Sequence, residues 1–140
     1  MNPKYLTIHC SATQPDAKVN AAVIRDWHVN GNGWSDIGYH YVINRDGSIE
    51  KGRSIDRQGA HTYGHNKDNI GVCLVGGVDS DLNPEDNFTD VQWDALRYMI
   101  SYLAGLYGIK EENIKGHRDW GAKKACPSFD VKTKLEEWKR

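Results

Sequence analysis

The chain contains few cysteines and no long hydrophobic run. Its three cysteines, Cys10, Cys73 and Cys126, are odd in number and none belongs to a CxxC pair, which argues against a disulfide framework. We expect Cys10 and Cys73 to be small buried residues on strands. No apolar stretch approaches the ~20 residues that a membrane-spanning helix requires. The N-terminal sequence MNPKYLTIHCSATQ lacks the apolar core of a signal peptide, so we expect the protein to remain in the cytoplasm.

The sequence also lacks an excess of charge of either sign. It has 18 Lys and Arg against 19 Asp and Glu, and its formal net charge is −1. Neither nucleic acid nor a membrane is therefore expected as a partner, because both would call for a basic surface. The chain has 140 residues, of which 39% are hydrophobic and 26% charged, which is typical of a globular protein with a real core. Without an internal repeat or a linker, residues 1–140 are expected to form a single domain.

Alternating and continuous apolar patterns predict five extended segments. In KYLTIHC, alternation places His9 on the same face as Tyr5 and Thr7. The turn sequence NRDG between two short segments is a strong β-hairpin signal. The run IGVCLV is typical of a central strand that is buried on both faces. The expected extended segments are residues 4–10, 39–43, 48–51, 70–75 and 114–117.

Three helices are predicted among these strands. Thr89 and Gln92 form the capping box of the longest one, and Gly108 is its expected C-terminal stop. Asp130 is expected to cap the last helix. Because strands and helices alternate, we predict an α/β fold, and the hairpin makes its central sheet mixed. The residues expected to face the core are Val23, Ile24 and Trp27 in a helix over 20–30, Leu96, Ile100, Leu103 and Leu106 in the second helix, and Val131, Leu135 and Trp138 in the last.

The stretch GHRDWGAKKACPSFD, residues 116–130, places an imidazole, an ammonium group and a thiol close together in the sequence. His117, Lys124 and Cys126 supply these groups, and His9, at the end of an apolar run, is a candidate for a further ligand. Two histidines and one thiolate suit Zn²⁺. Three protein ligands leave the fourth tetrahedral position open for water, which is typical of catalytic rather than structural zinc sites.

Each of these residues also has a simpler interpretation. A lone histidine on a strand is more often structural, and His117 and Cys126 are too far apart for one helix face, so their spacing alone is a weak metal signal. Lys124 is also compatible with a solvated surface lysine, and Tyr39 with a core aromatic residue beside the hairpin. His28, on the first predicted helix, is expected at the surface.

Four short motifs occur in order along almost the whole chain. They are HCSAT at 9–13, DIGYHYVINRDGSIEKGR at 36–53, NIGVCLVGG at 69–77 and KACPSFD at 124–130. With these motifs the chain resembles the zinc-dependent N-acetylmuramoyl-L-alanine amidases, and within them the branch of the bacteriophage T7-type lysozymes. The same family is related to the peptidoglycan recognition proteins of animals.

The resemblance implies a set of site residues. Tyr39 of GYHY matches the family's active-site tyrosine, and Lys124 matches the lysine two positions before the cysteine. The segment between the second and third zinc ligands is slightly longer than in the phage branch, so Lys123 remains an alternative to Lys124. The residues that match the three zinc ligands are His9, His117 and Cys126. The histidine of the GAH segment lines the cleft in this family, so the resemblance implies substrate contact or support of the site for His61. Residue type alone, and not the resemblance, adds Trp34 and Asn69 as candidates for substrate contact.

The resemblance also implies a function. We expect one Zn²⁺ per chain and hydrolysis of the amide bond between N-acetylmuramic acid and L-alanine in peptidoglycan. A monomeric phage or prophage endolysin that accumulates in the cytoplasm and reaches the cell wall after membrane breach fits the sequence. Two alternatives remain: a peptidoglycan-binding module that has lost hydrolysis, and a structural zinc site in a protein of other function. For binding of a cytoplasmic protein partner the sequence has no signal.

Overall fold

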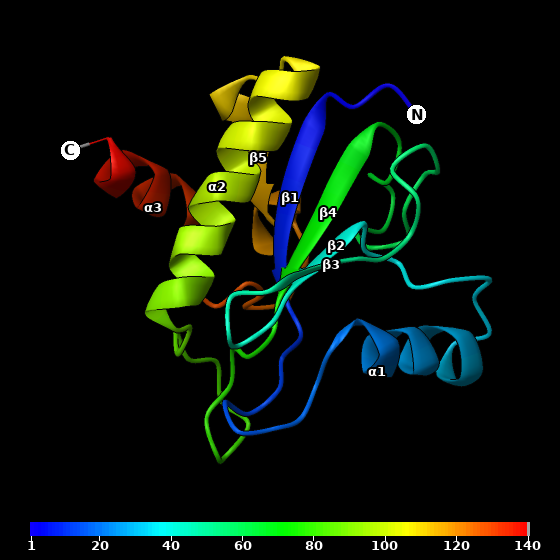
Figure 1. Cartoon of the computed structure of the whole chain (residues 1–140), viewed down its shortest axis with the longest axis vertical. Coiled ribbons are helices and arrows are strands. Elements are labelled where there is room, and N and C mark those ends of the chain that lie inside the picture. The colour runs from blue at the N-terminus through cyan, green and yellow to red at the C-terminus, as the bar shows by residue number, and fades with distance from the viewer. Residues whose placement is uncertain (140) are drawn as a thin grey trace.

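One mixed β-sheet with helices on both faces organises the chain (Figure 1). The computed structural model describes residues 1–139. The strand order is β3-β2-β4-β1-β5, so the first strand in sequence lies inside the sheet. This arrangement confirms the predicted α/β class with a mixed sheet. The strands are β1 (Tyr5–Cys10), β2 (Tyr41–Ile43), β3 (Ile49–Lys51), β4 (Asn69–Leu74) and β5 (Ile114–Gly116).

Strands β1, β2, β4 and β5 run parallel to one another, and β1 lies between β4 and β5. It pairs with β4 along its whole length, from Tyr5 opposite Asn69 to Cys10 opposite Leu74. On its other edge it pairs with the short strand β5, which places Ile8 opposite Gly116. Strands β1 and β4 are almost completely buried, as expected for parallel strands that are covered on both faces.

The predicted hairpin forms the antiparallel edge of the sheet. Strand β2 pairs with β3, and β2 also pairs in parallel with β4. In the turn between the two strands, the N–H of Gly47 donates to the carbonyl of Asn44 at 2.9 Å. Gly47 has a φ of 85°, a conformation that a residue without Cβ adopts at no steric cost. Both strands are shorter than predicted, because residues 39 and 40 lie in an irregular approach to β2.

The helices lie where the sequence predicts them, but some residues predicted to face the core are exposed. The capping box of Thr89 and Gln92 is present, and Gly108 ends α2 with a φ of 66°. Leu106, however, is 58% exposed, so its predicted place in the core was wrong. The apolar stripe ends instead with Leu103, Ala104 and Tyr107, of which Ala104 and Tyr107 are partly buried against the core. Leu106 lies on the exposed side of the last turn. The helices are α1 (Ala21–Asp26), α2 (Asp90–Tyr107) and α3 (Val131–Trp138), with short turns η1 (Trp27–Gly31), η2 (Glu111–Asn113) and η3 (His117–Trp120).

Two hydrophobic clusters cover the two faces of the sheet. Alternation along β1 sends Leu6, Ile8 and Cys10 into the larger cluster, where they meet α2 and α3. The smaller cluster lies on the opposite face, where Ile24 of α1 packs with Cys73. Cys10 and Cys73 are both buried, as predicted. The odd-numbered positions of β1 therefore face the side of the sheet that α1 only partly covers.

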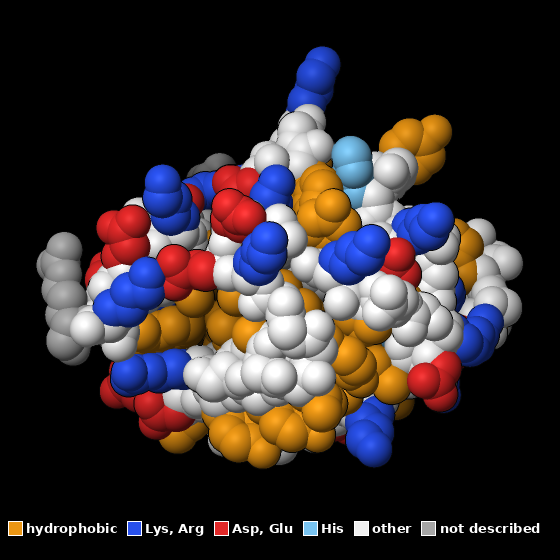
Figure 2. Space-filling view, turned by 90° about the horizontal axis from the view of Figure 1, so that it is seen from above, with side chains coloured by type: hydrophobic (Ala, Val, Ile, Leu, Met, Phe, Trp, Pro, Cys, Tyr) orange, Lys and Arg blue, Asp and Glu red, His pale blue; other side chains and the backbone are white. Residues whose placement is uncertain are grey.

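The surface carries charges of both signs. Figure 2 shows Lys and Arg side chains interspersed with Asp and Glu side chains over the face seen from above. This distribution agrees with the nearly balanced composition of the chain. No helix among residues 1–139 is long and apolar enough to cross a membrane.

Candidate metal centre

The sheet brings His9 and His117 together. His9 is the fifth residue of β1, and His117 directly follows β5, the strand that pairs with β1 up to Gly116. Because adjacent parallel strands end at the same edge, both imidazoles emerge side by side, with ring centroids 4.6 Å apart. His9 is almost completely buried, and His117 is half-buried.

Cys126 reaches the two histidines from the loop that follows η3. The ligand atoms of His9, His117 and Cys126 all lie within 4.8 Å of one another. The Sγ atom of Cys126 lies 4.0 Å from Nδ1 of His9. The loop is anchored by the N–H of Arg118, which donates to the carbonyl of Cys126 at 3.0 Å, and the Cys126–Pro127 peptide bond is cis. Two segments that are distant in sequence, the end of β1 and residues 117–126, thus form one cluster.

Tyr39 lies directly against this cluster. Its ring centroid is 5.0 Å from that of His9, and Tyr39 also lines the groove above it. Burial raises the pKa of the Tyr39 hydroxyl well above its ordinary value, and the nearby thiols of Cys73 and Cys126 act in the same direction. The hydroxyl is therefore protonated at neutral pH and is a hydrogen-bond donor close to the cluster.

The two candidate lysines both reach the groove, but they differ electrostatically. Lys123 and Lys124 are exposed and contribute to its wall. The positive charge of Lys124 is felt by both histidines, because it lowers the pKa of His9 and that of His117. Lys124 is thus the lysine whose charge acts on the cluster.

An open groove of about 530 Å³ leads to the cluster. Trp34, from the turn after α1, and Tyr63, from the loop before β4, stand on its walls. Tyr63 is almost fully exposed, so its ring is available to a ligand. The other lining residues are His28, Asn32, Tyr39, Ala60, His61, Thr62, Asn66, His117, Ala122, Lys123 and Lys124.

The three residues expected to contact substrate lie in different places. Trp34 lines the groove. His61 also reaches it but is 8% exposed, and both of its ring nitrogens have hydrogen-bond partners within the protein. Asn69 is fully buried below the groove, so the structure does not place it for substrate contact. Its side chain instead accepts from the Thr7 hydroxyl at 2.8 Å and donates to the carbonyl of His65 at 2.8 Å.

His28 is a groove residue that the sequence analysis placed at the surface. It lies in the π-helical turn η1, where the N–H of Asn32 donates to the carbonyl of Trp27. The His28 ring packs against Trp34 and accepts from the N–H of Gly38 at 2.9 Å. The wider turn changes which residues face the protein, and Trp27, predicted to be in the core, is 42% exposed. Regular 3.6-residue periodicity could not reveal this change.

Burial keeps the histidines of the cluster neutral. It lowers the pKa of His9 well below the ordinary value, and neighbouring His61, His117 and Lys124 lower it further. Burial and Lys124 lower the pKa of His117 in the same way. Both imidazoles are therefore unprotonated near pH 7, the form in which histidine binds a metal ion.

The surroundings of the Cys126 thiol raise its pKa, whereas they lower the pKa of the two histidines. The neighbouring Cys10 thiol, followed by burial, raises the pKa of Cys126. A thiol that coordinates a divalent cation loses its proton. A bound cation would therefore lower the pKa of the Cys126 thiol. Two neutral imidazoles and one thiol on a common point are the donor set that Zn²⁺ prefers, and their placement at the end of a groove fits an ion that also meets a substrate.

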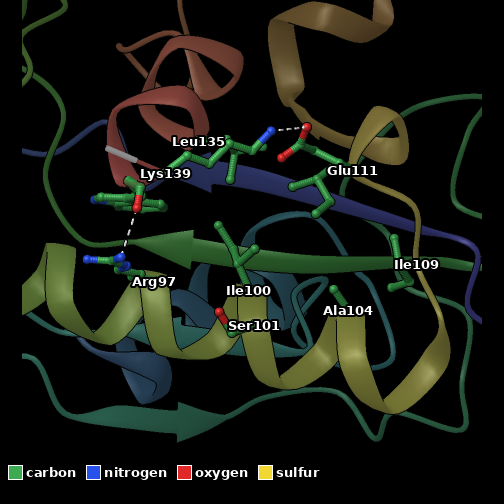
Figure 3. Close-up of a pocket in the computed structure, with 10 residues that line it drawn as sticks. Arg97, Ile100, Ser101, Ala104, Ile109, Glu111, Leu135 and Lys139 are labelled. Atoms are coloured by element: carbon green, nitrogen blue, oxygen red, sulfur yellow. Dashed lines mark hydrogen bonds and ion pairs between the residues drawn. The ribbon is translucent and has the colours of Figure 1, made fainter.

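A second hollow lies between α2 and α3, away from the cluster (Figure 3). Apolar residues such as Ile100 and Leu135 form its floor. Its charged side chains already have partners within the protein. Lys139 pairs with Glu111 at 2.7 Å, and Arg97 donates to the carbonyl of Trp138 at 2.9 Å. This hollow is thus a packing seam between two helices.

Comparisons with known proteins agree with this geometry. A family model described as N-acetylmuramoyl-L-alanine amidase matches residues 1–129. An endolysin of Enterobacteria phage K11 is 47% identical over 94% of this chain and 82% of its own length. An endolysin of Escherichia phage T7 is 44% identical over 89% of this chain and 80% of its own length. Among solved structures, the N-acetylmuramoyl-L-alanine amidase LysC of Clostridium intestinale superposes with a TM-score of 0.80 at 28% identity, covering 96% of this chain and 86% of LysC.

Proposed function

This chain belongs to the N-acetylmuramoyl-L-alanine amidase family, and we propose that it works with one Zn²⁺ ion held by His9, His117 and Cys126. The enzyme hydrolyses the amide bond that links N-acetylmuramic acid to L-alanine in peptidoglycan. The observation that carries the zinc proposal is the convergence of three ligand atoms within 4.8 Å at the end of an open groove. A structural zinc site normally has four protein ligands, whereas this cluster offers three.

The residues around the cluster suit amide hydrolysis. When bound, zinc supplies Lewis-acid chemistry, because it lowers the pKa of water and polarises a carbonyl group. The Tyr39 hydroxyl, which burial keeps protonated, donates a hydrogen bond to the oxyanion that develops on the scissile carbonyl. The ammonium group of Lys124 stabilises the same negative charge from the groove wall. Stabilisation of developing charge by fixed donors is often the largest contribution to catalysis of acyl transfer.

The groove suits a sugar-peptide substrate. The flat side chains of Trp34 and Tyr63 offer surfaces on which a sugar ring stacks, and Asn66 lies beside them. Asn66, however, uses its Oδ1 atom to accept from the N–H groups of His61 and Thr62, so it shapes the groove wall. We assign substrate contact to Trp34 and Tyr63.

The biological role that fits this chain is host lysis by a phage endolysin. Endolysins of two phages are among its relatives, and each aligns over four fifths or more of its own length. We propose that the protein acts as a monomer, accumulates in the cytoplasm and degrades the cell wall after the inner membrane is breached. Peptidoglycan is then its partner in the cell.

The rival function is a recognition module that binds peptidoglycan without cleaving it. Against this alternative speaks the cluster itself, because three ligand atoms converge within 4.8 Å, the Tyr39 ring packs against His9 and Lys124 lines the adjoining groove. The decisive experiment measures the release of free L-alanine amino termini from purified peptidoglycan, with chelator and with zinc added back.

Chelator-sensitive release of amino termini, without new reducing sugar ends, is the expected result. Release that persists after complete removal of metal would contradict the zinc site, while the amidase activity would stand. Tight binding to peptidoglycan without any release would instead support the recognition module.

A further inference from the structure

His61 makes a chain of hydrogen bonds that ends at His9. Its Nε2 atom lies 2.9 Å from the carbonyl oxygen of Asn69, and its Nδ1 atom lies 2.9 Å from Nε2 of His9. The two rings meet edge to face, with centroids 4.9 Å apart. All of these groups are buried below the groove.

The partners determine which nitrogen carries each proton. A carbonyl oxygen only accepts, so Nε2 of His61 must donate to Asn69. The Nδ1 atom of the neutral His61 ring is then an acceptor. At 2.9 Å from that acceptor, Nε2 of His9 must carry a proton, because two lone pairs would otherwise face each other. The remaining nitrogen of His9, Nδ1, is therefore the one with the free lone pair.

Thr62 does not change this assignment. Its hydroxyl lies 2.9 Å from Nδ1 of His61 and 3.5 Å from Nε2 of His9. Because a hydroxyl rotates to suit its neighbours, its O–H shares the single lone pair of His61 Nδ1 with the His9 N–H. The closer contact between the two imidazoles still requires a proton on His9.

The free lone pair of His9 lies on the side of the candidate metal ligands. Its Nδ1 atom is the one that lies 4.0 Å from Sγ of Cys126. We propose that His61 is a positioning residue, which holds His9 in the tautomer whose Nδ1 atom can bind the metal ion. This inference rests on the proposed zinc site, and it assigns to His61 a role other than substrate contact.

The fold makes room for the His61 ring at two glycines. A Cβ atom at Gly71 of β4 would lie 2.6 Å from Cδ2 and Cγ of His61, and a Cβ atom at Gly59 would lie 2.6 Å from Cδ2. Such distances are too short for any real contact. The ring thus occupies a space that exists because these positions lack side chains. Neither glycine has a positive φ, so at Gly71 the space, and not the backbone conformation, requires glycine.

Nuclear magnetic resonance of the metal-free, ¹⁵N-histidine-labelled protein tests the tautomer directly. We expect His9 to carry its proton on Nε2, with a scalar coupling through the hydrogen bond to Nδ1 of His61. A proton on Nδ1 of His9 would overturn the proposal. This readout needs no metal, so it remains decisive even if the wild-type protein binds no zinc and the proposed function fails.

The zinc affinity of matched His61 variants tests whether His61 strengthens metal binding by His9. Zn²⁺ is titrated in competition with a chromophoric chelator. Removal of such a partner typically costs about 10–100-fold in metal affinity, and we expect this loss for His61→Leu. His61→Asn restores an acceptor at the place of Nδ1 and is expected to retain most of the affinity. His61→Gln restores only the donor at the place of Nε2 and is expected to behave like His61→Leu.

Gly71→Ala provides a test that keeps the imidazole. The added methyl group displaces the His61 ring, so zinc affinity should fall as it does in His61→Leu. Gly105→Ala, whose Cβ atom meets nothing within 4 Å, is the matched control and should leave the affinity unchanged. Equal losses in His61→Leu and His61→Asn, or wild-type affinity in His61→Leu, would overturn the positioning role. Urea unfolding of each variant separates these outcomes from loss of the fold.

Discussion

The backbone N–H of Cys10 donates a hydrogen bond to the Sγ atom of Cys126 at 3.2 Å. The end of β1 therefore contributes to the candidate ligand cluster twice, through the His9 imidazole and through the amide of the next residue. Donation to a sulfur favours its thiolate form and draws electron density away from it. This contact is fixed by the backbone, so it does not depend on the identity of the side chain at position 10.

Replacement of Cys126 by serine should remove zinc from the protein. A serine hydroxyl is a poor substitute for a thiolate at a zinc site, so we expect a zinc content well below one ion per chain. Elemental analysis of the purified variant measures it. Cys73→Ala is the control, because Cys73 is fully buried in β4 and outside the ligand cluster. Unchanged zinc in Cys126→Ser would exclude Cys126 as a ligand.

Replacement of Lys124 by alanine should slow catalysis while zinc stays bound. Loss of one stabilising group for an oxyanion costs about 10²–10³ in kcat. Lys123→Ala is the matched control, since Lys123 lies next in the chain and lines the same groove. Rates of amino-terminus release from peptidoglycan compare the two variants. If Lys123→Ala caused the larger loss, the roles of the two lysines would be exchanged.

Replacement of Tyr39 by phenylalanine should also slow catalysis while zinc stays bound. The ring that packs against His9 remains, whereas the hydroxyl proposed to donate to the oxyanion is lost. We expect kcat to fall by about 10²-fold, with zinc content and the unfolding midpoint unchanged. Tyr41→Phe serves as the comparison, because Tyr41 packs against the larger hydrophobic cluster. A Tyr39→Phe variant with wild-type kcat would remove the hydroxyl from the mechanism.

Acid should destabilise the metal-free protein through His61. Burial lowers the pKa of His61 from 6.5 to about 3. Below pH 6.5 the unfolded chain binds this proton and the folded chain does not, so stability decreases as the pH falls from 6.5 towards 3. The slope from this one group approaches about 1.4 kcal/mol per pH unit. Urea unfolding between pH 7 and 4 measures it.

His61→Asn should reduce that slope, because asparagine does not titrate in this range. The other buried histidines, such as His40, still contribute, since burial also lowers the pKa of His40. The difference between the two slopes therefore reports His61 together with its effect on the pKa of the neighbouring His9. Identical slopes in wild type and variant would mean that His61 titrates normally in the folded protein.

Gln92 links α2 to the sheet, and its loss should be costly for stability alone. It is fully buried, and its amide donates to the carbonyls of Val75 and Ile43 while its oxygen accepts from Arg45. Gln92→Leu removes these hydrogen bonds, although the Ile43 carbonyl keeps the N–H of Val75 and the Val75 carbonyl keeps Arg45 as donors. Each lost hydrogen bond is expected to cost about 0.5–1.5 kcal/mol. We expect a lower urea midpoint with unchanged zinc content.

Thr89→Ala tests the contribution of the N-terminal cap of α2 by itself. It removes the side-chain acceptor of the Gln92 N–H and is expected to cost about 1 kcal/mol. A Gln92→Leu variant no less stable than Thr89→Ala would show that Gln92 contributes through the helix cap alone. Both variants lie outside the groove, so their activity per folded molecule should match the wild type.

The local structure of this protein follows from its sequence. Apolar alternation is enough to predict β1, and the turn sequence NRDG predicts the hairpin. The Thr89–Gln92 box and Gly108 mark the ends of α2 correctly. These signals are readable because backbone geometry repeats every two residues in a strand and every 3.6 in a helix. The motifs also identify the family, because their order along the chain is a property of the sequence.

Tertiary structure decided how the site is assembled. His9 and Cys126 are 117 positions apart, and only the strand order β4-β1-β5 together with the loop after η3 brings them to one place. Periodicity carries no information about strand order. For the same reason, the sequence did not reveal that Asn69 lies below the groove or that η1 turns His28 into it. Such placements depend on contacts between distant segments, which no local pattern records.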